Sequence, residues 1–264
     1  MSKQNRLTAE NADRHDLYQE SVQDCDDTIA LIDRIYERRH RRPPLTLRED
    51  FCGTALLCSE WARRRADRFA TGIDIDAPTL AWGRRHNLEP LGEASARVRL
   101  LERDVREGTP GDEFDVIAAL NFSYFTFHHR ETLLDYFRAA RRDLSDGGML
   151  LLDLHGGPDA QFQLEEETEF DGFTYVWEQE MFDPINNRAT SRIHYRFPRG
   201  GGELRDAFVY DWRVWSIPEL RDALADAGFS GSDVWWEGEH DDEPHLADSA
   251  ENLEAWVAYI AAWR

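Results

Sequence analysis

The sequence predicts an α/β fold in which a mostly parallel sheet of seven strands carries helices on both faces and an antiparallel β meander is inserted after the fifth strand. Strand-like apolar runs and helical segments alternate from residue 45 to residue 155, which is the rhythm of βαβ units. Aromatic and apolar side chains then alternate with other residues in three runs, at 173–177, 193–197 and 208–214, a period typical of antiparallel strands. A helix and two more strand-like runs follow, so the α/β alternation resumes at the end.

Composition limits the classes of protein that fit. The 264 residues, of which 41% are hydrophobic, suit one domain with an elaboration. The formal net charge of -21 argues against a nucleic-acid partner, because such a surface repels polyanions. The three cysteines have neither metal-ligand spacing nor an even disulfide set, so we predict no metal and a cytoplasmic protein. No run approaches the ~20 apolar residues of a membrane span, so no membrane partner is expected.

The predicted elements divide the first part of the chain in two. Residues 1–44 form an N-terminal segment, with Ile29, Ile32 and Ile35 at helical spacing before Pro43. Residues 45–157 form the core. Its elements are a strand at 45–50, a helix at 54–67, a strand at 69–74, a helix at 78–86, strands at 97–104 and 114–121, a helix at 131–144 and a strand at 149–155.

Two further regions complete the chain. Residues 158–215 are the inserted sheet, with turn residues at 183–187 and 198–202 separating the aromatic runs. Residues 216–264 return to the core. Ser216 and Glu219 have the spacing of a capping box at the start of a helix. The last two strands are predicted at 232–237 and 256–263, on either side of an acidic loop at 239–251.

A candidate cofactor site lies where the first two strands end. Glu49 closes the first strand, and the chain runs through Gly53 directly into a helix. Open parallel sheets place cofactors at such a point, and glycine permits close backbone approach. Asp74 ends the second strand, at about the spacing expected for a carboxylate that accepts hydrogen bonds from ribose hydroxyls, and Ile75 follows it.

At these segments the chain resembles the class I S-adenosylmethionine-dependent methyltransferases, which have a Rossmann-like fold. The first motif of that family is an acidic residue followed by Gly-x-Gly-x-Gly, and it is matched here by Glu49, Cys52, Gly53 and Thr54. Phe51 and Ala55 stand where the family has its outer glycines, which predicts a slightly different loop path around the methionine part. The resemblance extends over about residues 45–157 and implies S-adenosyl-L-methionine as the cofactor.

The resemblance assigns further roles. Asp104 and the backbone of Val105 would contact the adenine ring, and Asn121 and Phe122 would lie beside the reactive methyl group. Tyr18 resembles N-terminal residues that close over the cofactor. The predicted cofactor-binding residues are therefore Tyr18, Glu49, Cys52, Gly53, Thr54, Asp74, Ile75, Asp104, Val105, Asn121 and Phe122.

Methyl transfer from a sulfonium needs a base only when the nucleophile is protonated, because the leaving group is a neutral thioether. Placement of the reactants and exclusion of water are the main requirements. Tyr124 and His155, at the expected mouth of the sheet, are the predicted catalytic residues. His128, Glu178 and Asp211 are further candidate bases. The aromatic meander would cover an apolar or cationic acceptor.

Three functions remain open, with a small-molecule acceptor favoured. The alternatives are a methyltransferase that modifies protein or RNA, and a non-catalytic cofactor-binding protein that uses the aromatic insertion as an interface. A nicotinamide-dependent dehydrogenase is disfavoured, because residues 52–57 lack the Gly-x-Gly-x-x-Gly turn that admits a pyrophosphate. Unpaired edges of the inserted sheet would allow a homodimer.

Overall fold

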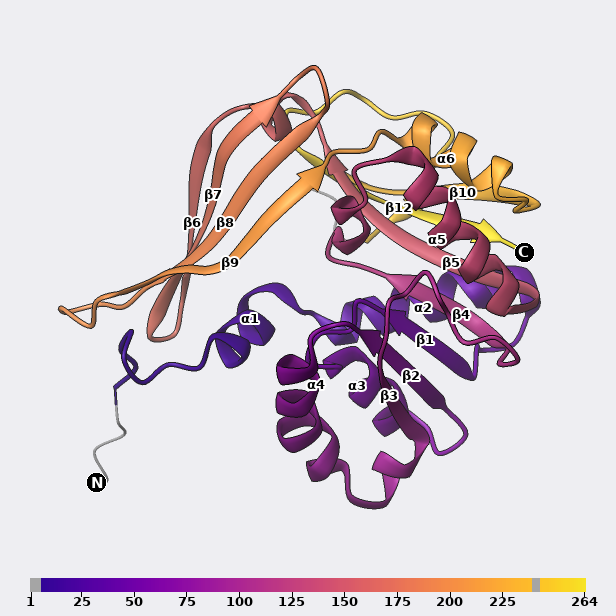
Figure 1. Cartoon of the computed structure of the whole chain (residues 1–264), viewed down its shortest axis with the longest axis horizontal. Helices are drawn as coiled ribbons and strands as arrows, with labels where there is room; N and C mark the ends of the chain where they lie inside the picture. The colour runs from indigo at the N-terminus through magenta and orange to yellow at the C-terminus, as the bar shows by residue number, and fades with distance from the viewer. Residues whose placement is uncertain (1–5, 239–242) are drawn as a thin grey trace.

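A central sheet of eight strands and a separate sheet of four strands make up the structure, a computed structural model that describes residues 6–238 and 243–264 (Figure 1). The central strands are β1 (Thr46–Asp50), β2 (Phe69–Asp74), β3 (Val98–Glu102), β4 (Phe114–Ala119), β5 (Leu144–Gly156), β10 (Gly231–Gly238), β11 (His245–Leu246) and β12 (Trp256–Trp263). Their order is β11-β10-β12-β5-β4-β1-β2-β3. The first five strands are parallel, and β12 runs antiparallel between β5 and β10.

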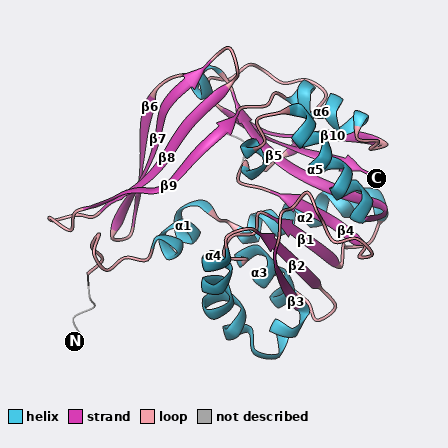
Figure 2. Ribbon diagram, viewed as in Figure 1, coloured by secondary structure: helices cyan, strands magenta, loops and turns pink. Residues whose placement is uncertain are grey.

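Helices cover both faces of this sheet (Figure 2). The helices are α1 (Arg14–Val22), α2 (Cys25–His40), α3 (Leu56–Arg64), α4 (Ala77–Gly83), α5 (Arg130–Asp143) and α6 (Ile217–Asp226). Strand β5 shows why two layers are needed: Leu150 and Leu152 pack in the cluster that holds α5 and α6, whereas Met149 and Leu151 pack in the cluster that holds α2 and α3. A strand that is apolar on both faces requires cover on both faces.

The predicted fold class is confirmed, and the structure adds one strand. Seven central strands were expected, whereas β11 is an eighth and lies inside the predicted acidic loop. This short strand forms because Trp235 and Trp236 of β10 offer an unpaired edge to Leu246 and His245. Residues 239–242 of the predicted loop lie outside the described residues.

The inserted sheet has four strands instead of the three aromatic runs that the sequence indicates. They are β6 (Leu164–Phe170), β7 (Phe173–Asp183), β8 (Arg188–Arg196) and β9 (Glu203–Arg213), in that order. Strand β6 was missed because a run of glutamates hides its alternation. Its charge is balanced across the sheet, since Arg196 Nη2 donates to Glu165 Oε1 at 2.9 Å and also pairs with Glu167.

Helix α1, which the sequence analysis also missed, lies between the two sheets (Figure 1). Its sequence is mostly polar, so periodicity gives little signal, but Asp13 caps its first turn by accepting from the amide of His15. Leu17 is buried in the cluster of the inserted sheet. On the other side, Gln19 Nε2 donates to Thr54 Oγ1 at 2.7 Å, which ties the helix to the loop after β1.

Within residues 6–238 and 243–264, no helix combines the length and the apolar character that crossing a bilayer requires.

Candidate functional site

The loop between β1 and α3 has left-handed backbone at three alternate positions. Phe51, Gly53 and Ala55 have φ values of 58°, 52° and 56°. For a residue other than glycine, this conformation costs about 1–2 kcal/mol. Phe51 is held there by ring contacts with Phe127 and Tyr136, at centroid distances of 5.7 and 5.9 Å. The two residues that replace the expected glycines therefore adopt the conformation that glycine takes most readily.

Asp74 joins this loop to the end of β2. Its Oδ2 accepts from the amide of Gly53 at 2.8 Å, and its Oδ1 accepts from the amide of Asp76 at 2.9 Å. Ile75 beside it is 73% exposed and offers an apolar surface at the edge of the sheet. The structure thus brings together three residues that the sequence analysis singled out, and each Asp74 oxygen has a further lone pair to offer.

The predicted adenine contacts follow β3. Asp104 is half-buried, and both of its oxygens lie 3.0 Å from Arg106 Nε. This pairing lowers the pKa of Asp104, which keeps it ionised. The Val105 side chain is buried in the core, so that residue can offer only its backbone to a ligand.

Two other matched residues point their side chains inward. Cys52 is buried, and its amide donates to the carbonyl of Ile73 at 3.0 Å. Thr54 is also buried, and its carbonyl accepts from Asn87 Nδ2 at 2.9 Å. Both residues shape the loop, and Thr54 in addition receives the hydrogen bond from α1.

Tyr18, on α1, lies against the inserted sheet. Its ring packs on Phe208 at a centroid distance of 4.8 Å, and its side chain shares a hydrogen bond with Tyr210. Burial raises the pKa of Tyr18 to about 12, so the hydroxyl stays protonated. The residue after Tyr18, Gln19, reaches the cofactor loop through its hydrogen bond to Thr54.

Asn121 and Phe122 follow β4, and a carboxylate of the neighbouring strand β5 holds them. Both residues have left-handed backbone, with φ values of 55° and 57°. Asp153 accepts from the amide of Asn121 at 2.6 Å and from the amide of Phe122 at 2.9 Å. The sequence analysis gave Asp153 no role, because nothing in the local pattern shows that it faces the end of β4.

A cavity of about 500 Å³ opens between the N-terminal part of α2, from Cys25 to Arg34, and the carboxyl ends of β1, β4 and β5. The predicted residues Glu49 and Asn121 line it, together with Asp153, Glu237 and Tyr259, which the sequence analysis missed. Burial raises the pKa of all three carboxyls, and that of Glu49 and of Asp153 reaches about 7. None of them forms an ion pair within the described part of the chain. Such a wall suits a ligand that carries positive charge.

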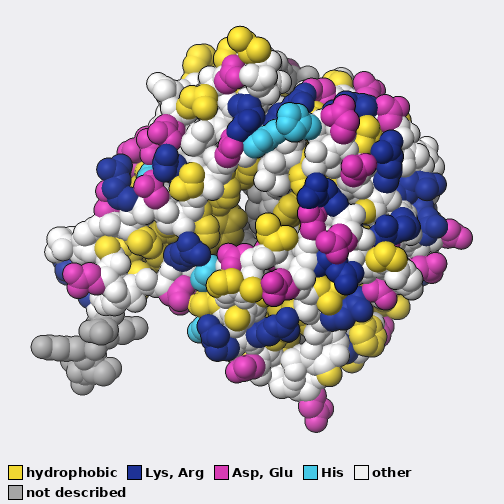
Figure 3. Space-filling view, viewed as in Figure 1, with side chains coloured by type: hydrophobic (Ala, Val, Ile, Leu, Met, Phe, Trp, Pro, Cys, Tyr) yellow, Lys and Arg dark blue, Asp and Glu magenta, His cyan; other side chains and the backbone are white. Residues whose placement is uncertain are grey.

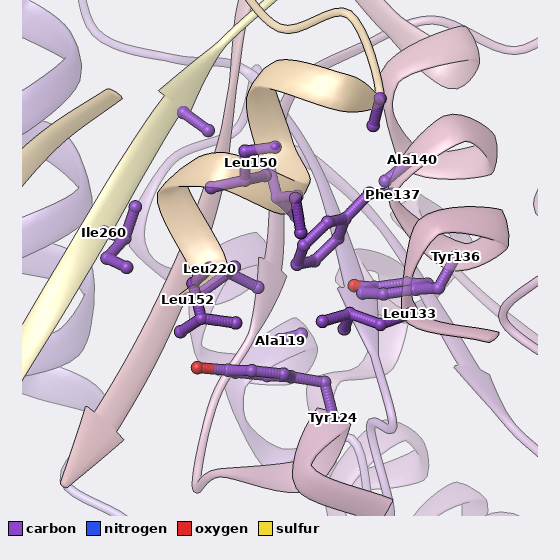
Figure 4. Close-up of a cluster of buried hydrophobic side chains, with 14 of the residues drawn as sticks. Ala119, Tyr124, Leu133, Tyr136, Phe137, Ala140, Leu150, Leu152, Leu220 and Ile260 are labelled. Carbon is purple, nitrogen blue, oxygen red and sulfur yellow. The ribbon is translucent and has the colours of Figure 1, made fainter. Parts of the chain in front are cut away.

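Tyr124 occupies a place that does not support a catalytic role. Its side chain is 0% exposed and lies in the hydrophobic cluster among Leu133, Tyr136 and Leu152 (Figure 4). The hydroxyl donates to the carbonyl of Asp153 at 2.7 Å. Burial raises the pKa of Tyr124 well above its usual range, so it remains a donor instead of becoming a base.

His155 is placed near the end of β5 among aromatic rings. Phe122 and Trp212 lie at centroid distances of 4.7 and 6.4 Å. Burial lowers the pKa of His155 to about 4, so the imidazole is neutral at neutral pH. Its Nε2 is buried and has no hydrogen-bond partner among the described residues. With Trp177 and Gln179 it lines a second cavity of about 200 Å³.

The other candidate bases already have partners. Glu178 Oε2 lies 2.8 Å from His194 Nε2, and Asp211 forms an ion pair with Arg188. His128 Nε2 lies 2.7 Å from the carbonyl of Asp211. These three residues are therefore weaker candidates than His155.

Aromatic side chains of the inserted sheet face the core. Tyr210 and Trp212 stack at a centroid distance of 4.3 Å, and Trp177 lies 6.0 Å from each of them. Figure 3 shows the molecule hollowed between the inserted sheet and the core, with hydrophobic side chains in the depth of the hollow. This arrangement provides an apolar wall opposite the carboxyl ends of the central strands.

Comparisons with known proteins agree with this geometry. A family model described as a methyltransferase domain matches residues 50–152. An S-adenosylmethionine-dependent methyltransferase from Clostridium acetobutylicum has 15% identity and a TM-score of 0.69, over 94% of this chain and 96% of that one. An S-adenosylmethionine-bound amino pentose methyltransferase from Micromonospora echinaspora has 16% identity and a TM-score of 0.68, over 95% and 96%.

A third structure extends over the whole chain. The sugar N-methyltransferase from Streptoalloteichus has 19% identity and a TM-score of 0.66, and the match covers 100% of this chain and 96% of that one. No protein of curated function matches the sequence. The chain therefore matches a methyltransferase domain over residues 50–152 and has the fold of S-adenosylmethionine-dependent methyltransferases.

Proposed function

We propose that the protein transfers the methyl group of S-adenosylmethionine to a small-molecule acceptor that binds between the central sheet and the inserted sheet. A cavity of about 200 Å³, lined by His155 and by Trp177 of the inserted sheet, supports an acceptor there, and the observation that carries the proposal is the larger cavity of about 500 Å³ at the carboxyl ends of the central strands. Its volume lies in the range of small-molecule sites, about 300–1,000 Å³. Its wall combines two residues matched to the family, Glu49 and Asn121, with carboxylates that lack a cation.

The residues present fit the cofactor. S-adenosylmethionine, when bound, supplies a methyl group on a positively charged sulfur. Glu49 would face its cationic end, the loop at 51–55 would lie under its methionine part, and Asp74 would accept from its ribose hydroxyls. Asp104 and the Val105 backbone would meet the adenine ring. The buried carboxyl of Glu49, which forms no ion pair within the described residues and would be stabilised in its ionised form by a cationic ligand, supports this orientation.

The chain's own contribution to the reaction is placement and the exclusion of water. Phe122, Trp177 and Trp212 present apolar surface where the two sheets meet. His155 contributes a neutral imidazole with an unpartnered Nε2, which can accept a hydrogen bond from the O–H or N–H of a nucleophile. A nucleophile without a proton would need no such contact.

Two further observations support a small acceptor. The net charge of -21 disfavours RNA. The structures of similar fold include an amino pentose methyltransferase and a sugar N-methyltransferase, which makes sugars and their amines the first acceptors to screen. We also propose a cytoplasmic location, which the three free cysteines support.

The Asp74→Ala substitution tests the cofactor assignment. We expect binding of S-adenosylmethionine to weaken by about 10- to 100-fold, because charged hydrogen bonds contribute about 1.5–3 kcal/mol and the Gly53 amide also loses its acceptor. Isothermal titration calorimetry measures this, with S-adenosylhomocysteine and NAD as further ligands. Asp67→Ala is the matched control, since Asp67 is exposed and its ion-pair partner among the described residues is Arg65.

The binding experiment tests the cofactor assignment, and a second experiment tests the class of acceptor. Wild-type protein that binds neither adenosyl ligand would contradict the proposal as a whole. Where binding is found, amino sugars, neutral sugars and a basic peptide are incubated with S-adenosylmethionine, and release of S-adenosylhomocysteine is followed. Turnover with the peptide alone would overturn the small-molecule assignment.

A further inference from the structure

We propose that Asp153 is a positioning residue that fixes the turn at Asn121 and Phe122, and through it the spacing between the cofactor and the acceptor wall. The inference rests on the proposed function, because it assumes that the turn faces the transferred methyl group. Asp153 acts through the backbone of the turn and is not assigned a contact with the reacting atoms.

The geometry of the sheet places Asp153 next to the turn. Strands β4 and β5 are parallel neighbours, with Ala119 opposite Leu152. The next residue of β5 therefore stands beside the point where β4 ends. Asp153 is 7% exposed, and its two carboxylate oxygens each accept one backbone amide of the turn, from Asn121 at 2.6 Å and from Phe122 at 2.9 Å.

The turn needs such an anchor. Asn121 and Phe122 are consecutive residues with left-handed backbone, and neither is glycine. Within the described residues, the carboxylate of Asp153 is the acceptor for both of their amides. A third bond ties the following segment to the same residue, because Tyr124 Oη donates to the Asp153 carbonyl at 2.7 Å. These hydrogen bonds from Asp153 hold the turn in a strained conformation that would otherwise relax.

The turn carries one residue on each side of the site. Asn121 lines the cavity of about 500 Å³ together with Glu49. The ring of Phe122 faces His155 at 4.7 Å and Trp212 of the inserted sheet at 6.1 Å. A displacement of this turn would therefore alter the cofactor side and the acceptor side together. Small misplacements of this kind reduce transfer rates strongly.

Asp153→Asn tests the inference, because the amide side chain can accept from only one of the two backbone amides. We expect S-adenosylmethionine to bind at least 5-fold more weakly, since its methyl group faces the displaced turn. S-adenosylhomocysteine, which lacks that methyl group, should stay within 2-fold of wild type. Calorimetry gives both dissociation constants, and amide hydrogen exchange should show lost protection at Asn121 or Phe122.

Tyr124→Phe is the matched control. It removes the hydrogen bond to the Asp153 carbonyl but leaves the carboxylate and both amides in place, so it should lower the melting temperature without changing the ratio of the two dissociation constants. Asp153→Glu keeps the negative charge in the cavity wall but moves the carboxylate by one methylene, so it should change the same ratio; an unchanged ratio in this variant would mean that loss of charge alone explains Asp153→Asn.

The outcomes are distinct from failure of the proposed function. Equal weakening of both ligands, or no change in either, would overturn the positioning role. Wild-type protein that binds neither ligand would instead remove the proposed function on which the inference rests.

Discussion

Replacing Arg48 with methionine is expected to lower the free energy of unfolding by about 3–5 kcal/mol, the largest stability effect of any substitution considered. Arg48 is 0% exposed in β1. Its Nε lies 2.9 Å from Asp50 Oδ1, and its Nη1 lies 2.6 Å from Asp143 Oδ2. Methionine fills a similar volume but leaves the buried carboxylate of Asp50 without its cation and that of Asp143 with Arg142 alone. Urea denaturation at neutral pH, followed by tryptophan fluorescence, measures the loss.

A surface arginine on a neighbouring part of the sheet is the control. Arg99, in β3, pairs with Asp112, and half of its side chain is exposed. Arg99→Met should therefore change the free energy of unfolding by less than about 1 kcal/mol. Adding Asp50→Asn to Arg48→Met should recover part of the loss, because one buried charge is removed. A loss for Arg48→Met as small as that of Arg99→Met would contradict the account.

The fold could be predicted because its signals are local and periodic. The strands expected at 69–74 and 256–263 have the bounds of β2 and β12. Residues 256–263 are a nearly continuous apolar run, and residues 70–73 of β2 are buried, so in both strands the sequence pattern reflects burial. Helix α1 and strand β6 were missed because their polar residues are stabilised by partners far along the chain, as Arg196 is for the glutamates of β6.

The same distinction explains which parts of the site were found. The loop at 51–55 and Asp74 follow directly from strand ends in the sequence, and the structure joins them through the Gly53 amide. Asp153 and Glu237 reach the cavity from β5 and β10, whose positions beside it depend on the order of the strands. Arg48 meets Asp143 of α5, 95 positions later. No local pattern reports such contacts.

The second large effect is expected at Glu49. Replacing this candidate cofactor-binding residue should stabilise the folded protein, because its carboxyl is buried. Glu49 is 8% exposed, and burial raises its pKa from 4.5 to about 7. The folded protein therefore holds a proton that the unfolded chain releases between these pH values, so this group lowers stability as pH rises from 4.5 to 7. At pH 8 the ionised carboxyl opposes folding by about 3 kcal/mol.

Glu49→Gln should remove this penalty. The glutamine carbonyl can still accept from the Cys58 amide, which lies 3.1 Å from Glu49 Oε2. We expect the free energy of unfolding without ligand to rise by up to about 3 kcal/mol at pH 8 and by less than about 1 kcal/mol at pH 5. Denaturation curves at the two pH values measure the gain. Glu93→Gln, at an exposed position, should show no gain at either pH.

The same substitution should weaken the binding of S-adenosylmethionine, because a cationic ligand loses the carboxylate that compensates its charge. Near pH 6.5 the wild-type protein should release protons on binding, since the cation lowers the pKa of Glu49, and Glu49→Gln should release fewer. Calorimetry in buffers with different ionisation enthalpies measures this release.

A variant that is more stable but binds more weakly would show that the buried charge is kept for the ligand at the expense of stability. A variant that is less stable at both pH values would instead make Glu49 a support for the first turn of α3, and its place in the cofactor site would be wrong.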